Sequence, residues 1–156
     1  MRTETKRSKA KIKDEFIREV NVHYRMTEHR GNAMTEPDQV AQFFRTVTVD
    51  NSREHFAALY LDGASHVVCY SIISIGTANS TLVSPREVFQ RAVLVGAVSV
   101  LVAHNHPSGK LVASDEDIQT TRRLKGSGEL IGVRLLDHVI VSDTSYLSLR
   151  HTLRPW

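Results

Sequence analysis

The sequence predicts an α/β protein of the α+β type, in which a single mixed β-sheet is flanked by helices. Strand-like runs rich in β-branched residues are interleaved with amphipathic helical segments along most of the chain. One run, residues 98–103, is almost entirely apolar, as expected of a central strand covered on both faces. The length of 156 residues suits one domain with its own hydrophobic core.

The composition is that of an ordinary globular protein, with 41% hydrophobic and 24% charged residues. No apolar run approaches the roughly 20 residues that a membrane helix needs, and no apolar leader follows the N-terminal charges. A single cysteine, Cys69, excludes an internal disulfide framework. These features predict a cytoplasmic protein that does not contact a membrane.

The positive charge is concentrated at the N-terminus. Residues 1–13 contain six basic side chains and one acidic side chain, whereas the rest of the chain contains 14 basic and 16 acidic side chains. We therefore expect a flexible basic tail over residues 1–13 and a body without a basic face. Contact with nucleic acid is expected only through that tail.

The body divides into residues 14–34, predicted as an N-terminal strand and a loop, and residues 35–156, predicted as the main domain. Phe16–Tyr24 has the β-branched and aromatic character of a first strand. Thr35 is placed to cap a helix, and Pro37 suits the first turn of that helix.

A β-hairpin is predicted next, because the turn signal Asp62-Gly63-Ala64 separates two strand-like runs, Glu54–Leu61 and Ser65–Ile75. The first run alternates two sets of residues, Phe56, Ala58 and Tyr60 against Ala57, Leu59 and Leu61.

Two further helices have recognisable starts. Ser84-Pro85-Arg86-Glu87 reads as a capping box that opens a helix through Val95. Ser114 opens another helix to about Lys125, which Gly126 and Gly128 are expected to end.

The C-terminal part is predicted to form two strands, Ile131–Leu136 and His138–Ser142. A short strand or turn over Tyr146–Leu149 follows them.

The residues with metal-binding chemistry lie at the end of the apolar run. His104 and His106 can aim both imidazoles to one side of an extended segment. A helix that starts near Ser114 can fold Asp117 back onto them. Two imidazoles and one carboxylate, with water in the fourth position, make an open catalytic Zn²⁺ site.

A hydrolase with such a metal also needs a general base and a donor for the developing oxyanion. Glu54, at the start of a predicted strand, is our candidate base, with a solvated carboxylate at a strand edge as the alternative. Glu87 is a competitor, although the predicted capping box explains it without catalysis. Ser114 is the candidate oxyanion donor.

Simpler roles exist for several of these residues. Ser114 to Asp117 also form a helix-capping sequence, and a cap would compete in part with metal binding by Asp117. His138 either hydrogen-bonds a metal ligand or touches substrate, or it is an ordinary turn histidine. The two metal-site histidines themselves could be loop residues satisfied by hydrogen bonds.

His104, His106, Ser114 and Asp117 fit the H-x-H-x7-S-x2-D pattern of JAMM/MPN+ zinc metalloproteases. Together with Ser84-Pro85-Arg86-Glu87 upstream, His104-Asn105-His106-Pro107-Ser108-Gly109, and Leu135-Leu136-Asp137-His138 downstream, the chain resembles the RadC family of that superfamily. The resemblance covers roughly Thr35 to Ser142.

The resemblance implies an MPN/JAB (cytidine-deaminase-like) architecture and Zn²⁺ held by His104, His106 and Asp117. It also implies Glu54 as general acid/base and Ser114 as the oxyanion-side donor. The expected function is a zinc-dependent hydrolase that cleaves an amide or isopeptide bond in a peptide or protein. Asn105 stands where the wider superfamily has serine or threonine, which leaves the substrate open.

The alternative function is a DNA-repair-associated accessory or binding module without protease turnover. Full-length RadC proteins carry an N-terminal helix-hairpin-helix segment, and residues 1–34 lack its glycine-bearing hairpin. The chain is therefore expected to represent the domain without that segment. The sequence does not predict an oligomeric state.

Overall fold

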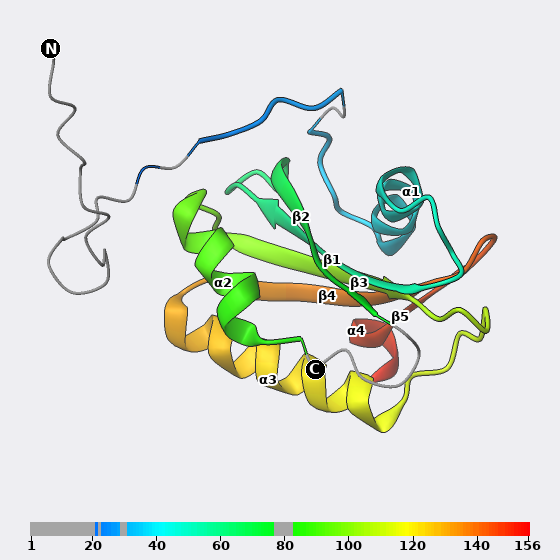
Figure 1. Ribbon diagram of the computed structural model, residues 1–156. Helices are drawn as coiled ribbons and strands as arrows, with labels where there is room; N and C mark the ends of the chain where they lie inside the picture. The colour runs from blue at the N-terminus through cyan, green and yellow to red at the C-terminus, as the bar shows by residue number, and fades with distance from the viewer. Residues whose placement is uncertain (1–20, 22, 29–30, 77–82) are drawn as a thin grey trace, which may run out of the picture.

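The structure contains the predicted sheet with helices packed on its faces (Figure 1). It is a computed structural model that describes residues 21, 23–28, 31–76 and 83–156. Five strands form one sheet in the order β2-β1-β3-β4-β5. The pairing of β3 with β4 is parallel and the other pairings are antiparallel. The predicted fold class is thereby confirmed.

The elements follow one another in nearly the predicted order. They are α1 (Pro37–Val47), β1 (Glu54–Leu61), β2 (Val67–Gly76), α2 (Pro85–Leu94), β3 (Ser99–Asn105), α3 (Asp115–Ile131), β4 (Arg134–Val141), β5 (Tyr146–Ser148) and α4 (Leu149–Thr152). The predicted basic tail, residues 1–13, lies outside the described residues. So does most of the predicted strand Phe16–Tyr24, whose described positions 21, 23 and 24 are not in a strand.

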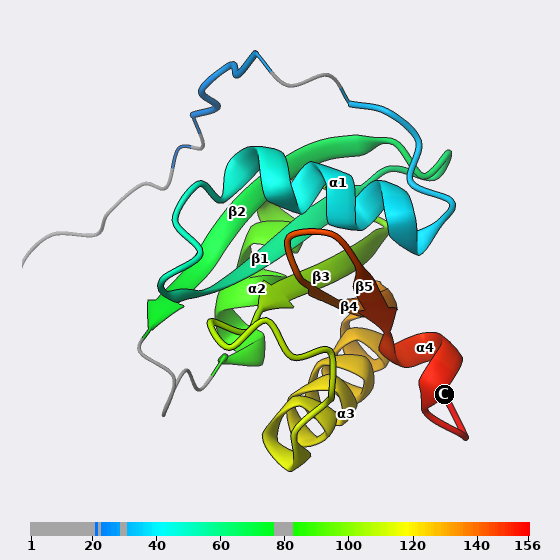
Figure 2. The same ribbon diagram turned by 90° about the vertical axis from the view of Figure 1, so that its right-hand side faces the viewer.

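The sheet separates two hydrophobic clusters. Helix α1 packs on one face, and α2 and α3 cover the other, as the two perpendicular views show (Figures 1 and 2). The alternation predicted for β1 sorts its side chains between these clusters, with Phe56, Ala58 and Tyr60 facing α2 and α3, and Ala57, Leu59 and Leu61 facing α1. Strand β1 is therefore buried on both sides.

The topology brings distant segments to one edge of the sheet. Helix α3 connects the parallel strands β3 and β4, so both strands end at the same edge. Strand β1 runs antiparallel to β3, so its first residues lie at that edge too. The end of β3, the start of β1 and the first turn of α3 together build the candidate site.

Helix α3 is longer than the sequence predicts. Gly126 and Gly128 lie within it, and it ends at Gly132, which has a positive φ of 81°. Gly128 is needed for packing, because a Cβ there would lie 2.3 Å from the carbonyl oxygen of Val133 and 2.9 Å from the Phe89 ring. Close approach to Phe89 of α2 and to the connection that precedes β4, and not termination of the helix, accounts for this glycine.

The prediction of two strands around Asp137 is wrong. Strand β4 is continuous from Arg134 to Val141, with a shift of register where Leu135 pairs with Val100 and Asp137 pairs with Leu101. The shift leaves Leu136 as an extra residue, which is the pattern of a β-bulge. His138 consequently lies in the middle of a central strand.

Two predicted helix caps differ in detail. The N-cap of α1 is Glu36 and not Thr35, and Glu36 forms a capping box with Gln39. Ser84 is the N-cap of α2, but its side chain makes no capping hydrogen bond, so the predicted capping box with Glu87 is not formed. Pro37 and Pro85 occupy first-turn positions, as predicted.

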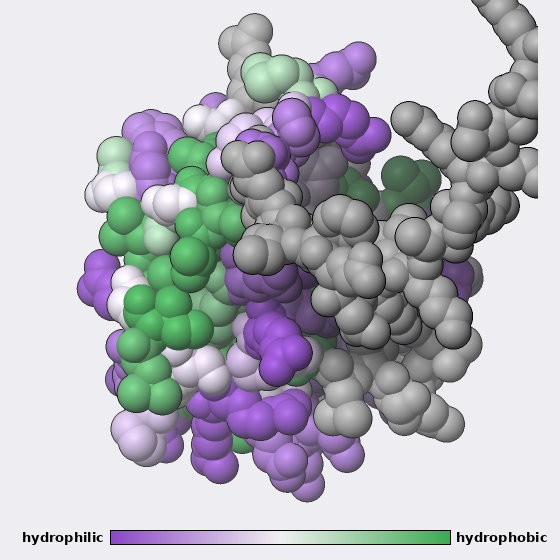
Figure 3. All heavy atoms as spheres, turned by 60° about the vertical axis from the view of Figure 1, so that its left-hand side comes forward, coloured by the Kyte–Doolittle hydropathy of each residue, from purple (hydrophilic) through white to green (hydrophobic). Residues whose placement is uncertain are grey.

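Several large apolar side chains are exposed near the ends of α2 and α3, away from the site. They are Val93, Leu94, Val98, Leu130 and Ile131. Figure 3 brings the left-hand side of Figure 1 forward and shows hydrophobic side chains gathered beside hydrophilic ones. Within the described parts of the chain, none of the helices combines the length and apolar character required to cross a bilayer.

Candidate metal centre

Three side chains converge at the carboxyl end of β3. The Nε2 atoms of His104 and His106 are 2.9 Å apart. Asp117 places Oδ1 3.1 Å from His104 Nε2 and Oδ2 3.4 Å from His106 Nε2. The structure thus brings together the three predicted metal ligands from the strand end and the first turn of α3, and these residues form a possible metal site.

Asp117 is held in place by the helix cap as well. Its Oδ2 accepts hydrogen bonds from the backbone N–H and the hydroxyl of Ser114, at 2.7 and 2.8 Å. In return, the backbone N–H of Asp117 donates to Ser114 Oγ at 3.1 Å. The capping role and the approach to the histidines, which the sequence suggests would compete, therefore coexist in one carboxylate.

The ring of His106 has a defined orientation. Its Nδ1 lies 2.8 Å from the carbonyl oxygen of Lys110, which can only accept, so Nδ1 carries a hydrogen. In the neutral ring, Nε2 then presents a lone pair toward Asp117 and His104.

Electrostatics reinforce this arrangement. The hydrogen bond to Asp117 raises the pKa of His106, burial opposes the rise, and the charge of Glu54 adds a weaker contribution. For Asp117, burial favours the neutral acid, but the hydrogen bonds with His104 and His106 outweigh it and hold the pKa of the carboxyl far below its usual range. Asp117 is therefore ionised, as a metal ligand must be.

The chemistry of the donor set fits a divalent metal. A neutral His106 and an ionised Asp117 offer only acceptor atoms to the space between them, so the cluster requires a cation, either a proton or a metal. Two imidazole nitrogens and one carboxylate oxygen are ligands that Zn²⁺ accepts, and three protein ligands leave room for water. The ligand atoms lie within 4.8 Å of one another.

Glu54 begins β1 at the same edge of the sheet. Phe56 pairs with His104 across the β1–β3 ladder, and its ring stacks on the His104 ring with centroids 6.0 Å apart. Residues two apart in a strand share a face, so Glu54 lies on the face of β1 that carries the candidate metal ligands. Continuing the register by two residues places Glu54 opposite His106.

Asn105 has a role that sequence reasoning missed. Its Oδ1 accepts the backbone N–H of His55 at 2.8 Å, and its Nδ2 donates to the carbonyl of Arg53 at 3.0 Å. These two backbone groups flank Glu54. The buried amide of Asn105 therefore ties the residues on both sides of the candidate base to the histidine segment.

His138 is fully buried beside the site. Its Nε2 lies 2.8 Å from His104 Nδ1, and its Nδ1 lies 2.6 Å from Thr121 Oγ1. Burial is the main reason that the pKa of His138 falls well below its ordinary value, so the ring is neutral. Of the predicted alternatives, the turn histidine is wrong, and the hydrogen bond to a candidate metal ligand, His104, is present.

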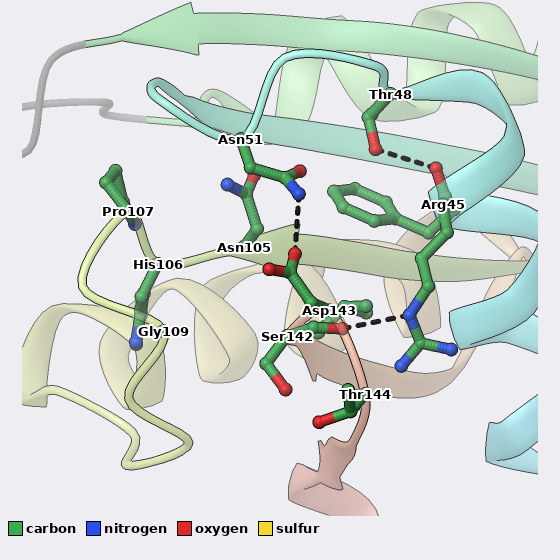
Figure 4. A pocket seen from close by; sticks show the side chains of 12 residues that line it. Arg45, Thr48, Asn51, Asn105, His106, Pro107, Gly109, Ser142, Asp143 and Thr144 are labelled. Carbon is green, nitrogen blue, oxygen red and sulfur yellow. Dashed lines mark hydrogen bonds between the residues drawn. The ribbon is translucent and has the colours of Figure 1, made fainter.

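A cavity of about 340 Å³ adjoins His106 on the other face of the sheet (Figure 4). Helix α1 lines it with Phe44 and Arg45, and the β4–β5 connection lines it with Asp143. Arg45 Nε donates to the carbonyl of Ser142 at 2.9 Å, which joins the two walls. The candidate metal centre thus borders a hollow lined mostly by polar and charged side chains, together with Phe44 and Val141.

Comparison with known proteins places this site in a family. The sequence model of the RadC-like JAB domain matches residues 34–154. The chain belongs to the RadC family. The predicted resemblance is therefore confirmed, and the mixed sheet with helices on both faces is consistent with the JAB/MPN fold of that family.

Relatives in the family are UPF0758 proteins from several bacteria. The chain is 43% identical to one from Finegoldia magna over 118 residues, which are 76% of the chain and 53% of that protein. It is 46% identical over 114 residues to one from Pelobacter propionicus, covering 73% and 50%. For one from Staphylococcus aureus the identity is 42% over 125 residues, covering 80% and 55%. The chain thus spans about half the length of these RadC-family relatives.

Proposed function

We propose that this RadC domain is a zinc-dependent hydrolase of the JAMM metalloprotease type, which cleaves an amide or isopeptide bond with water. The observation that carries the proposal is the convergence of His104, His106 and Asp117 at one edge of the sheet, with Glu54 on the same face. Bound Zn²⁺ would lower the pKa of a water ligand to about 7.

The side chains of the domain supply the remaining functions. Glu54 accepts the proton of the attacking water and then donates it to the leaving nitrogen. Ser114 is the candidate donor to the oxyanion, but its hydroxyl donates to Asp117 Oδ2 in this structure. It must rotate away from that carboxylate before it can stabilise the tetrahedral oxyanion.

A peptide or protein is the substrate that this chemistry suggests. In this proposal the cavity beside His106, on the α1 side of the sheet, receives one substrate side chain. A screen of peptide and isopeptide substrates, read by mass spectrometry, would identify the bond that is cleaved.

The metal part of the proposal is tested by elemental analysis of freshly purified protein. We expect about one zinc per chain, with loss of metal in His106→Ala and in Asp117→Ala. Protein that contains no zinc and takes up none would refute the proposal.

The catalytic part is tested with Glu54→Gln, which should retain zinc but lose turnover. Glu87→Gln is the matched control, since Glu87 lies in the first turn of α2, and it should keep both properties. Full turnover in Glu54→Gln would remove Glu54 from the mechanism.

A nucleic-acid-associated accessory role is the alternative that the charge of residues 1–13 favours. It predicts DNA binding that disappears when residues 1–13 are deleted, together with no hydrolysis by the zinc-loaded protein. DNA binding that survives the deletion would require a basic surface on the body.

A further inference from the structure

The cavity on the α1 side of the sheet lies between α1 and the β4–β5 connection and extends to the end of β3 (Figure 4). Its volume of about 340 Å³ is within the size range of pockets that bind small molecules. His106 belongs both to the lining of this cavity and to the candidate metal centre. A peptide held at the metal centre is therefore close to the cavity, and the chemistry of the lining indicates which side chain the cavity would accept.

Asp143 is the one acidic residue of the lining, and its capacity to accept hydrogen bonds is only partly used. Its Oδ1 accepts a hydrogen bond from the side-chain amide of Asn51. Within the described part of the chain, no hydrogen bond reaches Asp143 Oδ2 or Asn51 Oδ1. Figure 4 shows the carboxylate and the amide turned toward each other. These two side chains thus offer unused acceptor atoms to an occupant that carries donors.

Arg45 supplies a positive charge to the same lining, but it is directed to the β4–β5 connection. Its Nε donates to the carbonyl of Ser142 at 2.9 Å, and its Nη2 donates to the carbonyl of Ser145 at 2.8 Å. The ion pairs among the described residues all involve a histidine, so Arg45 does not form one with Asp143. Asp143 is therefore a carboxylate without an ion-pair partner in this part of the chain. Arg45 retains hydrogens on Nη1, so an anionic probe belongs in any test of the cavity.

Two apolar side chains, Phe44 and Val141, complete the lining beside these polar groups. They are 1% and 2% exposed, whereas Asp143 is exposed at the surface. A lysine or arginine side chain has the matching construction, because its aliphatic stem packs on apolar groups while its charged end stays near water. The combination of a carboxylate at the surface with buried apolar contacts favours such an occupant over a purely apolar one.

We propose that this cavity is a specificity pocket for a lysine or arginine side chain of the peptide substrate, and that Asp143 is the residue that determines the specificity. The cationic end donates hydrogen bonds to Asp143 Oδ2 and Asn51 Oδ1, and the stem contacts Phe44 and Val141. The proposal rests on the proposed hydrolase function for the peptide nature of the substrate. Binding in the cavity is nevertheless measured without turnover.

Hydrogen–nitrogen correlation NMR of the full chain as purified measures this binding through the side-chain amide signals of Asn51 and Asn105. The probes are the N-acetyl methylamides of lysine, of norleucine, which has the same stem without the ammonium group, and of glutamate. The lysine probe should shift both amide signals and bind about 3- to 10-fold more tightly than the norleucine probe, as expected of a charged hydrogen bond at a partly exposed site. The glutamate probe should bind more weakly than either. Added salt should reduce the advantage of the lysine probe.

Substitutions of Asp143 identify the group responsible. Asp143→Asn removes the charge but keeps the size and an acceptor for Asn51, so the lysine probe should lose its advantage over the norleucine probe. Asp143→Lys reverses the charge, so the glutamate probe should then bind more tightly than the lysine probe. Asp38→Asn is the matched control, because Asp38 is also an exposed carboxylate that accepts from a side-chain amide, that of Gln42, but it does not line the cavity. This control should bind all three probes as the wild type does.

The outcomes are distinct from those that test hydrolysis. Equal binding of the lysine and norleucine probes by the wild type overturns the specificity pocket, and so does the absence of binding by all three probes. Tighter binding of the glutamate probe would assign the cavity to Arg45 and an anion, which also overturns it. A lysine preference that disappears in Asp143→Asn, in a protein that hydrolyses no peptide, would support the pocket and refute only the hydrolase proposal. Hydrolysis of peptides with no preference for a basic side chain would refute only the pocket.

Discussion

Replacing Asn105 with alanine removes the link between the candidate base and the histidine segment. Two hydrogen bonds are lost, one from the His55 N–H at 2.8 Å and one to the Arg53 carbonyl at 3.0 Å. A typical hydrogen bond contributes about 1 kcal/mol, and a buried donor left without a partner costs about 1 kcal/mol or more. His55 is buried, so the loss in the free energy of unfolding should total about 2–3 kcal/mol.

Thermal denaturation of the metal-free protein measures this loss. For a chain of this length, 1 kcal/mol corresponds to about 2–4 °C, so Asn105→Ala should lower Tm by about 5–10 °C. Asn51→Ala is the matched control, because Asn51 is exposed and bonds only an exposed carboxylate, that of Asp143, among the described side chains. Its effect should stay within about 0.5 kcal/mol.

The same variant should separate metal binding from turnover. Asn105→Ala leaves His104, His106 and Asp117 unchanged, so zinc should still bind with the same stoichiometry. Turnover should fall by at least tenfold, because a shift of the strand that carries Glu54 moves the base relative to the metal. A Tm equal to that of Asn51→Ala, with full turnover, would refute the role assigned to Asn105.

Three further outcomes are expected. Removing zinc with a chelator should lower Tm, and adding free zinc should raise it. A free zinc concentration of 100 times Kd adds about 2.7 kcal/mol to the stability of the native state. A Tm that does not depend on zinc would contradict a zinc site in the native fold. Zinc affinity should fall about tenfold per pH unit below the raised pKa of His106 and level off above it, because the metal displaces the proton that Asp117 helps this ring retain. Calorimetry at several pH values measures this dependence. A zinc affinity that stays constant across pH 6–8, the range of an ordinary histidine titration, would contradict it. Gly128→Ala should destabilise the domain by about 1–3 kcal/mol because its Cβ would meet Val133 and Phe89. Gly126 is exposed with open space around it, so Gly126→Ala should stabilise α3 by about 0.5–1 kcal/mol. Denaturant unfolding compares the two variants, and equal effects on stability would contradict the packing argument.

The sequence carries strong signals for the sheet and for the convergence of the histidines with Asp117. The apolar run before His104 predicts a buried strand, and the i, i+2 spacing of the histidines needs only an extended backbone to place both rings together. The cap at Ser114 is equally local, because it depends on residues three apart. Features that depend on short-range geometry could therefore be predicted.

Features set by tertiary packing could not. Gly128 resembles a helix end in sequence, but it is required by the carbonyl of Val133 and the ring of Phe89, which both lie outside α3. The bulge at Leu136 is invisible to periodicity, so the sequence divides β4 into two strands and puts His138 at the start of the second, whereas it lies inside one continuous strand. The role of Asn105 depends on backbone groups about 50 residues away.

The double use of Asp117 bears on how the domain acquires its metal. Ser114 holds this carboxylate by two hydrogen bonds, and the carbonyl of Lys110 orients the His106 ring before any ion arrives. Binding therefore costs little conformational entropy, in contrast to zinc fingers, which fold only around their metal. Uptake should proceed as rigid docking of an ion into a preorganised site, with a small heat-capacity change and no gain in helical circular dichroism.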